Sequence, residues 1–117
     1  MNEQELTDLS FLKVYASNNS SLMKNFIQSF LDKTPVSVKH LEDHFNEKNY
    51  HAVSRSAHSL KPQLSYMGIK SAHDLVVSIE ESAKDEPDVN HLSKSINNLK
   101  EILENAYSEL REKLKEL

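Results

Sequence analysis

The 117-residue sequence contains no cysteine, no tryptophan and a single glycine, and these absences limit both the fold and the chemistry. Without cysteine the chain forms no disulfide and uses no thiol, which is compatible with a reducing cytosol. One glycine and three prolines leave few residues suited to tight turns between strands. No apolar run reaches the roughly 20 residues that cross a bilayer, and the polar N-terminus is unlike a signal peptide. We therefore expect a cytoplasmic, mainly helical protein without a membrane span.

Charge and length narrow the class further. The net charge of −4 at pH 7 is small, and lysine and arginine residues do not cluster. Because a nucleic-acid interface normally needs a basic tract, we expect no DNA or RNA binding. The length suits one hydrophobic core, so we predict a single domain that comprises residues 1–117.

Apolar residues recur every three or four positions, as in amphipathic helices, and no stretch alternates with the period of a strand. The pattern predicts a short helix with Thr7 or Asp8 as its N-cap, and a strong helix with Asn19 or Ser20 as its N-cap. A break or kink is expected at Thr34-Pro35, because the residue before proline avoids helical angles, and a further segment covers about 36–47.

Three more helices are predicted at about 50–67, 70–84 and 89 to near the end of the sequence. Gly68 suits the left-handed position that closes a helix. The connections are short, so neighbouring long helices should be antiparallel. The predicted fold is all-α: an up-down antiparallel four-helix bundle with a short additional N-terminal helix.

His58 is the residue around which a candidate site can be built. The 50–67 segment has one apolar stripe, formed by Val53, Ala57, Leu60, Leu64 and Met67. At about 100° per residue, His58 lies roughly 130° from the middle of this stripe and should face solvent, with Lys61 one turn further on. A histidine near neutral pH is largely uncharged and nucleophilic, and an adjacent lysine can stabilise an anion formed on it.

Four residues share the outer side of this helix with His58 by helical angle: Ser54, Arg55, Pro62 and Ser65. We predict that they contact a partner, and that Tyr66 and Ile69 add apolar contacts. Gln63 lies nearly opposite His58 and is not expected to take part. Pro62 has no N–H and crowds the carbonyl group of His58, so the helix should bend there.

Two other histidines, His40 and His44, lie one helical turn apart, and Glu47 follows one turn later. This spacing can hold a divalent metal ion. No third ligand on a fixed backbone is evident, so we predict no metal site. A metal-binding bundle remains a hypothesis that a titration with Zn²⁺ or Ni²⁺ would test.

The stretch Ala57–Gly68 resembles the phosphoacceptor helix of the histidine-containing phosphotransfer (HPt) domains of two-component phosphorelays. The resemblance rests on His58, a hydrophobic residue two positions later, a lysine three later and a glycine ten later. It extends to other positions of the chain: Asp8, Leu9, Leu12, Phe26, Phe30, Pro35, Leu75, Ile79 and Glu80. The chain departs from the family at Pro62, where the family usually has glycine.

The resemblance implies a helical bundle that accepts a phosphoryl group on His58 from a receiver aspartyl phosphate and passes it to another receiver. In that interpretation Lys61 stabilises the phosphoryl group, and the receiver, which can be part of a hybrid histidine kinase, supplies Mg²⁺, so the chain needs no cofactor of its own. The sequence has no nucleotide-binding motif, which indicates a phosphoryl carrier without kinase activity. We expect a monomer. The alternative is a non-phosphorylated helical adaptor that binds a receiver or kinase.

Overall fold

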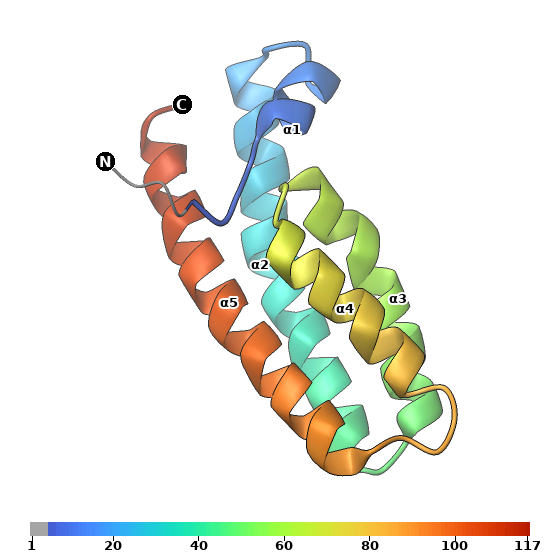
Figure 1. Ribbon diagram of the computed structural model, residues 1–117. Helices are drawn as coiled ribbons and strands as arrows, with labels where there is room; N and C mark the ends of the chain where they lie inside the picture. Colours follow the sequence, from blue (N-terminus) through green and yellow to red (C-terminus); the bar gives the residue numbers. More distant parts are fainter. Residues whose placement is uncertain (1–4) are drawn as a thin grey trace.

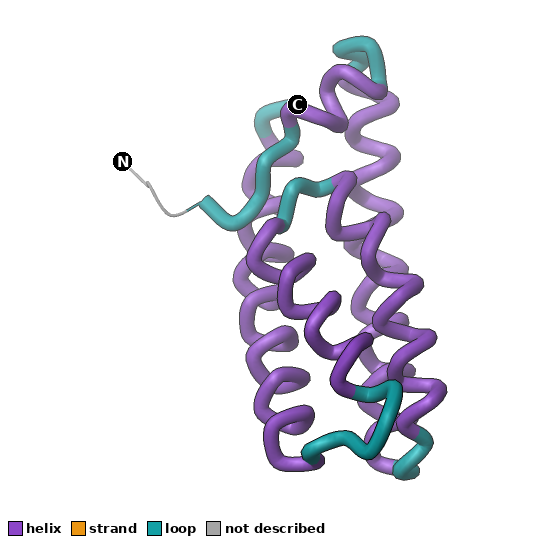
Figure 2. The backbone as a smooth tube through the Cα atoms, turned by 45° about the vertical axis from the view of Figure 1, so that its right-hand side comes forward, coloured by secondary structure: helices purple, strands orange, loops and turns teal. Residues whose placement is uncertain are grey.

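The computed structural model describes residues 5–117 and contains five α-helices (Figure 1). They are α1 (Ser10–Tyr15), α2 (Ser20–Asn46), α3 (Tyr50–Tyr66), α4 (Lys70–Ser82) and α5 (Val89–Lys115). Residues 1–4 of the predicted domain lie outside the described residues. Helices α2 to α5 run alternately up and down, and α1 lies at one end of this bundle (Figures 1 and 2). Residues 5–117 contain no strand, so the predicted all-α bundle with a short N-terminal helix is confirmed.

The helix boundaries follow from local capping chemistry. The side chains of Asn19, Asn49 and Asp88 accept hydrogen bonds from the first-turn N–H groups of α2, α3 and α5. Gly68 has a φ of +63° after the end of α3, as predicted. The N-cap of α1 is Leu9, one residue after the predicted Asp8, and the Asp8 carboxylate accepts a hydrogen bond of 2.9 Å from the N–H of Ser10, the first residue of the helix.

A break or kink was predicted at Thr34-Pro35, and the break is wrong, because α2 is continuous from Ser20 to Asn46 and includes both residues. An internal proline removes one backbone hydrogen bond and costs about 3 kcal/mol in an isolated helix. Tertiary contacts offset this cost here. Phe30 and Val38 are buried on either side of the proline, and the hydroxyl group of Thr34 donates a 2.6 Å hydrogen bond to Gln63 of α3. Residues 36–47 are therefore the second half of α2.

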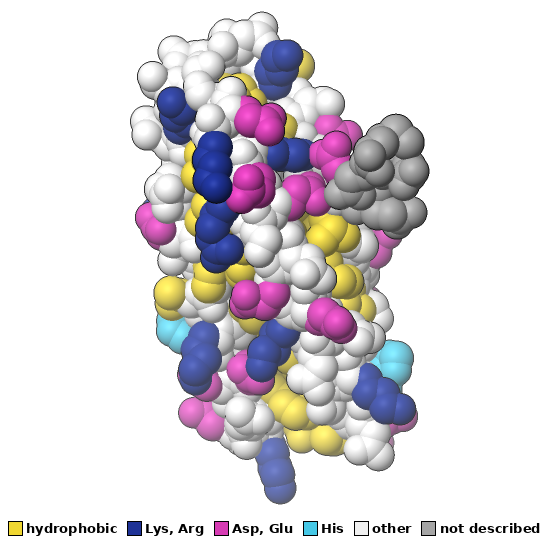
Figure 3. Space-filling view, turned by 90° about the vertical axis from the view of Figure 1, so that its left-hand side faces the viewer, with side chains coloured by type: hydrophobic (Ala, Val, Ile, Leu, Met, Phe, Trp, Pro, Cys, Tyr) yellow, Lys and Arg dark blue, Asp and Glu magenta, His cyan; other side chains and the backbone are white. Residues whose placement is uncertain are grey.

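One hydrophobic core fills the space between the four long helices. Each helix contributes fully buried aliphatic side chains, for example Leu41, Leu64, Ile79 and Leu103. Burial of such a side chain contributes about 1.5–3 kcal/mol. On the face that α5 forms, acidic and basic side chains lie beside one another (Figure 3). Lys100 of α5 pairs with Glu42 of α2 at 2.6 Å.

The segment before α1 is fastened to the bundle by an ordered set of hydrogen bonds. The carboxylate of Glu109 on α5 accepts bonds from the N–H groups of Leu6 and Thr7, at 2.9 and 2.8 Å, and from the Thr7 hydroxyl. Lys113 donates to the Thr7 hydroxyl at 2.7 Å, and the N–H of Asp8 donates to the carbonyl of Met67 at 3.1 Å. These bonds fix α1 against both α5 and the end of α3.

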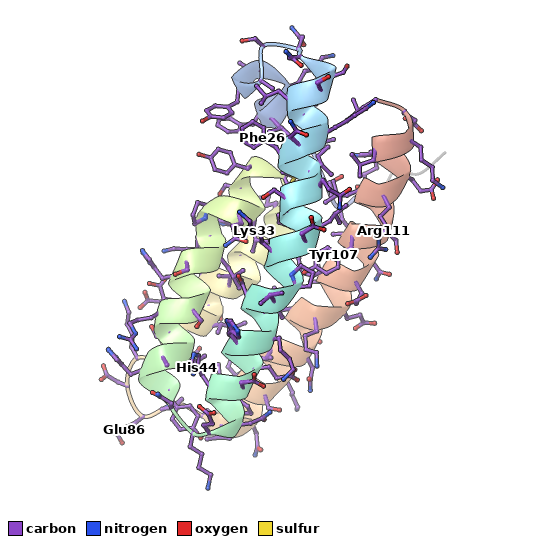
Figure 4. The ribbon with its side chains drawn as sticks, turned by 180° about the vertical axis from the view of Figure 1, so that it is seen from behind. Phe26, Lys33, His44, Glu86, Tyr107 and Arg111 are labelled. Atoms are coloured by element: carbon purple, nitrogen blue, oxygen red, sulfur yellow. The ribbon has the colours of Figure 1, made fainter. Side chains whose placement is uncertain are left out.

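Tyr107 has a buried hydroxyl group without a hydrogen-bond partner among the described residues. Its side chain is buried on α5, its ring packs edge-on against Phe30 at 6.0 Å, and its hydroxyl has no hydrogen-bond partner among the described residues (Figure 4). Burial raises the pKa of Tyr107 above its ordinary value.

Replacement of Tyr107 by phenylalanine should increase the free energy of unfolding by about 1 kcal/mol, because it removes an unpaired buried hydroxyl. Urea denaturation measures this, with the exposed Tyr15→Phe as control; a loss of stability would contradict it.

Candidate functional site

His58 lies on the outer face of α3, and its side chain is 66% exposed, which confirms the predicted outward orientation. Its Nδ1 atom is 2.9 Å from Oε2 of Glu80 on α4, the helix that packs beside α3 (Figure 1). An ionised carboxylate only accepts hydrogen bonds, so Nδ1 must carry the hydrogen. In a neutral imidazole the lone pair is then on Nε2, which lies on the side of the ring away from Glu80.

Lys61 meets the same carboxylate from the next turn of α3. Its Nζ atom is 2.8 Å from Oε1 of Glu80, so each oxygen of Glu80 has one partner. The Glu80 side chain is only 11% exposed. The hydrogen bond from the Lys61 ammonium lowers the pKa of the Glu80 carboxyl below its ordinary value, although burial opposes the shift. Glu80 is therefore ionised at neutral pH. Its carboxylate accepts hydrogen bonds from the Lys61 ammonium and from Nδ1–H of His58.

Ser54 requires a correction, because it is buried rather than on the outer surface. Its hydroxyl donates a 2.9 Å hydrogen bond to the backbone carbonyl of Glu80. The helical angle placed Ser54 close to His58, but on the side of α3 that α4 covers. Ser54 thus connects α3 to α4 at Glu80, and its buried side chain cannot contact a partner protein.

The other predicted docking residues of α3 are exposed: Arg55, Pro62 and Ser65. Their contact with a partner stays a prediction. Tyr66 is exposed as well, whereas Ile69 is completely buried, so its proposed docking role is wrong. Ile69 lies in the turn between α3 and α4 and fills the core beneath it. Helix α3 is continuous through Pro62.

Gln63 points away from His58, in agreement with its helical angle. Its amide oxygen accepts the hydrogen bond from Thr34 of α2, and its amide nitrogen donates to the carbonyl of Ser59 at 3.3 Å. These contacts place Gln63 at the boundary between α2 and α3, on the opposite side of α3 from Glu80. It has a structural role in the bundle.

A family model, the Hpt domain, matches residues 25–116 of the chain. The chain belongs to the Hpt domain family. Hpt domains carry out histidine phosphotransfer in phosphorelays and interact with receiver domains. No curated protein and no solved structure matched the chain. The matched residues include α3, with His58 and Lys61, and α4, with Glu80, whereas α1 lies before them.

The sequence analysis of this Hpt domain did not predict the contact between Glu80 and His58. The sequence nevertheless contains an indication of that contact. His58 and Glu80 are each eleven positions from Ile69, in the turn between α3 and α4. Residues equally distant from the turn of an antiparallel helix pair lie at the same height. Glu80 also follows the buried Ile79 and lies four positions after the buried Val76. A carboxylate at the edge of an apolar stripe indicates a specific partner.

Neither His40 nor His44 of α2 belongs to a group of three candidate metal ligands in the described part of the chain. Nδ1 of His44 is 3.8 Å from Glu47, and His44 points toward α3 in Figure 4, whereas His40 is exposed. Among residues 5–117, no three histidine, aspartate or glutamate side chains are grouped in a way that could hold a metal ion. In the same part of the chain, no helix has the length and apolar character to cross a membrane.

Proposed function

We propose that this Hpt domain is a phosphorelay intermediate that accepts a phosphoryl group on Nε2 of His58 from one receiver aspartyl phosphate and transfers it to another receiver. The observation that supports this is the exposed imidazole whose Nδ1 hydrogen is held by Glu80 while Nε2 is accessible. We further propose that the chain works as a cytoplasmic monomer without kinase activity of its own, with receivers that can belong to a hybrid histidine kinase.

In the forward step, the lone pair of Nε2 attacks phosphorus in line with the bond to the receiver aspartate. The N–P bond forms, the P–O bond breaks, and its electron pair stays on the aspartate as a carboxylate. The imidazole keeps its Nδ1 hydrogen and becomes cationic, and the adjacent Glu80 carboxylate, 2.9 Å away, stabilises that positive charge. In the return step the cationic ring is a good leaving group for attack by a second receiver aspartate.

Lys61 completes the site in this proposal. Its ammonium group is 2.8 Å from Glu80 and lies one turn from His58, so it can share its charge between the carboxylate and phosphoryl oxygens. Glu80 is already engaged by two groups, and no cluster of three possible metal ligands exists in residues 5–117. The residues around His58 therefore do not fit a Mg²⁺ site. We propose that the receiver supplies Mg²⁺ together with its own acidic pocket.

Transfer from a phosphorylated receiver tests the proposed function directly. A panel of receivers charged with phosphate is mixed with the Hpt domain, and transfer is followed by phosphate-affinity gel and ³¹P NMR. We expect an acid-labile, alkali-stable phosphoramidate on the domain. Receivers that bind the domain and transfer nothing would contradict the proposal and favour the adaptor alternative.

Glu80→Gln should slow phosphoryl transfer at saturating receiver by about 10–100-fold, because the amide keeps the size of the side chain but cannot stabilise a cationic imidazole by charge. Rapid-quench kinetics measure the rate, and a receiver titration should give an unchanged dissociation constant. The matched control is Glu81→Gln, since Glu81 is the exposed neighbour that pairs with Lys84 alone. Equal rates for Glu80→Gln and the wild type would remove Glu80 from the mechanism.

A further inference from the structure

The backbone carbonyl of Glu80 lies in the last turn of α4, where a helix leaves its carbonyl groups without partners from its own backbone. Helix α4 ends at Ser82. The N–H of Lys84, which would bond to Glu80 in a continued helix, donates to the carbonyl of Glu81 instead, at 3.3 Å. The Glu80 carbonyl accepts its hydrogen bond from the Ser54 hydroxyl of α3, at 2.9 Å. A residue of the neighbouring helix therefore completes this end of α4.

The bond between Ser54 and Glu80 is buried, since the two residues are only 6% and 8% exposed. A serine inside a helix often donates its hydroxyl to a carbonyl of the same helix one turn earlier. Ser59 does this: its hydroxyl donates to the carbonyl of Arg55 at 3.2 Å. Ser54 instead donates to another helix, so its hydroxyl fixes the backbone of α4 relative to α3.

Three successive turns of α3 meet the single residue Glu80. Ser54, His58 and Lys61 are spaced four and three positions apart, which places them along one side of the helix. Helices α3 and α4 lie side by side there (Figure 1). Ser54 bonds to the backbone of Glu80, whereas His58 and Lys61 contact its two carboxylate oxygens at 2.9 and 2.8 Å. The backbone bond therefore sets the point from which the carboxylate reaches His58.

The contact between His58 and Glu80 tolerates little displacement. The distance from Nδ1 to Oε2 is 2.9 Å, and a separation of about 3.6 Å is no longer a hydrogen bond. A neutral imidazole carries its hydrogen on one of two nitrogens. Without a carboxylate at Nδ1 the hydrogen can move to Nε2, and that tautomer has no lone pair on Nε2 for attack on phosphorus. The position of the Glu80 backbone thus determines which nitrogen is nucleophilic.

We propose that Ser54 is a positioning residue for phosphoryl transfer: its hydroxyl fixes the backbone of Glu80, so that the carboxylate keeps the hydrogen of His58 on Nδ1 and the lone pair on Nε2. The proposal rests on the proposed function and adds to it a residue that acts only through Glu80. Ser54 contacts neither the phosphoryl group nor the receiver, because its side chain lies beneath α4.

The kinetic test measures phosphoryl transfer by rapid quench at saturating receiver. Ser54→Ala should slow transfer about tenfold, since small displacements in an active site have effects of this size, and the dissociation constant of the receiver should not change. In the Glu80→Gln background, Ser54→Ala should slow transfer by less than about twofold more, because the two residues act in series. The matched control is Ser95→Ala, a serine of α5 that is also 6% exposed, and it should transfer as the wild type does.

The spectroscopic test examines the free domain, without a receiver. Two-bond ¹H–¹⁵N spectra of the His58 ring at alkaline pH distinguish the nitrogen with the hydrogen from the nitrogen with the lone pair. The wild type and Ser95→Ala should carry the hydrogen on Nδ1, and Ser54→Ala should show a mixture with the Nε2–H tautomer. Ser54→Cys, which is similar in size and keeps a weak donor, is the second variant should Ser54→Ala not fold, and it should show a smaller fraction of that tautomer.

The possible failures are distinct. If no receiver transfers phosphate to the wild type, the proposed function fails and the expected effect on transfer fails with it, whereas the ring spectra still decide whether Ser54 positions Glu80. If the wild type accepts phosphate and Ser54→Ala transfers equally fast with an unchanged ring spectrum, only the positioning role is overturned. Equal slowing by Ser54→Ala in the wild-type and Glu80→Gln backgrounds would also overturn it, because Ser54 would then act independently of Glu80.

Discussion

Replacement of His58 by glutamine should abolish phosphoryl acceptance from every receiver and leave the bundle folded. The glutamine amide has no nucleophilic lone pair on nitrogen, so no N–P bond can form at this position. The His58 side chain is 66% exposed, so we expect the free energy of unfolding to change by less than about 0.5 kcal/mol. The glutamine side-chain amide can still donate a hydrogen bond to the Glu80 carboxylate, which keeps the local contacts close to native.

Two measurements on His58→Gln distinguish the hypothesis of a phosphoryl carrier from that of a non-phosphorylated adaptor. Phosphate-affinity gels should show no transfer, while titration with the receiver should show binding close to that of the wild type. Retained binding with complete loss of transfer would eliminate the adaptor alternative. The control is His40→Gln, an exposed histidine on α2 that lies outside the site, and it should transfer normally. Phosphate acceptance by His58→Gln would show that another residue carries the phosphoryl group.

The fold could be predicted because its determinants are local and periodic. The apolar stripes of α2 to α5, the capping residue Asn19 and the single glycine after α3 all act within a few residues of sequence. Pro35 is a position at which local reasoning gave a wrong result. A local rule predicted a break or kink, but buried neighbours on the core side of α2 outweighed the lost hydrogen bond, and the helix does not break.

The candidate site could be predicted only in part, since half of it depends on the neighbouring helix. The outward orientation of His58 follows from helical angle alone. The burial of Ser54 depends on α4, which covers one flank of α3, and the role of Glu80 depends on the register between these two helices. The sequence gives the position of each residue along α3. Which residue of α4 lies opposite His58 depends in addition on the geometry of the turn between the two helices. That geometry is set at Gly68.

Gly68→Ala should therefore have the largest effect on stability of the changes considered, about 2–4 kcal/mol. The residue has a φ of +63°, which alone costs an L-residue about 1 kcal/mol or more. In addition, an added Cβ would lie 2.8 Å from the carbonyl carbon of Asp8 and closer still to its backbone oxygen. Backbone atoms cannot rotate away as a side chain can, so either the turn must open or the segment before α1 must shift.

Comparison of Gly68→Ala with Gly68→Asn distinguishes these two costs by urea denaturation. Asparagine tolerates the left-handed conformation better than alanine does, but it brings the same Cβ. Equal losses for both variants would show that the contact with Asp8 dominates, and a clear recovery with asparagine would show that φ dominates. The exposed Ser65→Ala, three residues earlier, is the control and should change stability by less than about 0.5 kcal/mol. A cost below about 1 kcal/mol for Gly68→Ala would contradict the described packing of Asp8 on this turn. Asp8 donates its N–H to the carbonyl of Met67, and the N–H of Thr7 is bound by Glu109, so the loss of stability in Gly68→Ala would also report how firmly α1 is held beside α3.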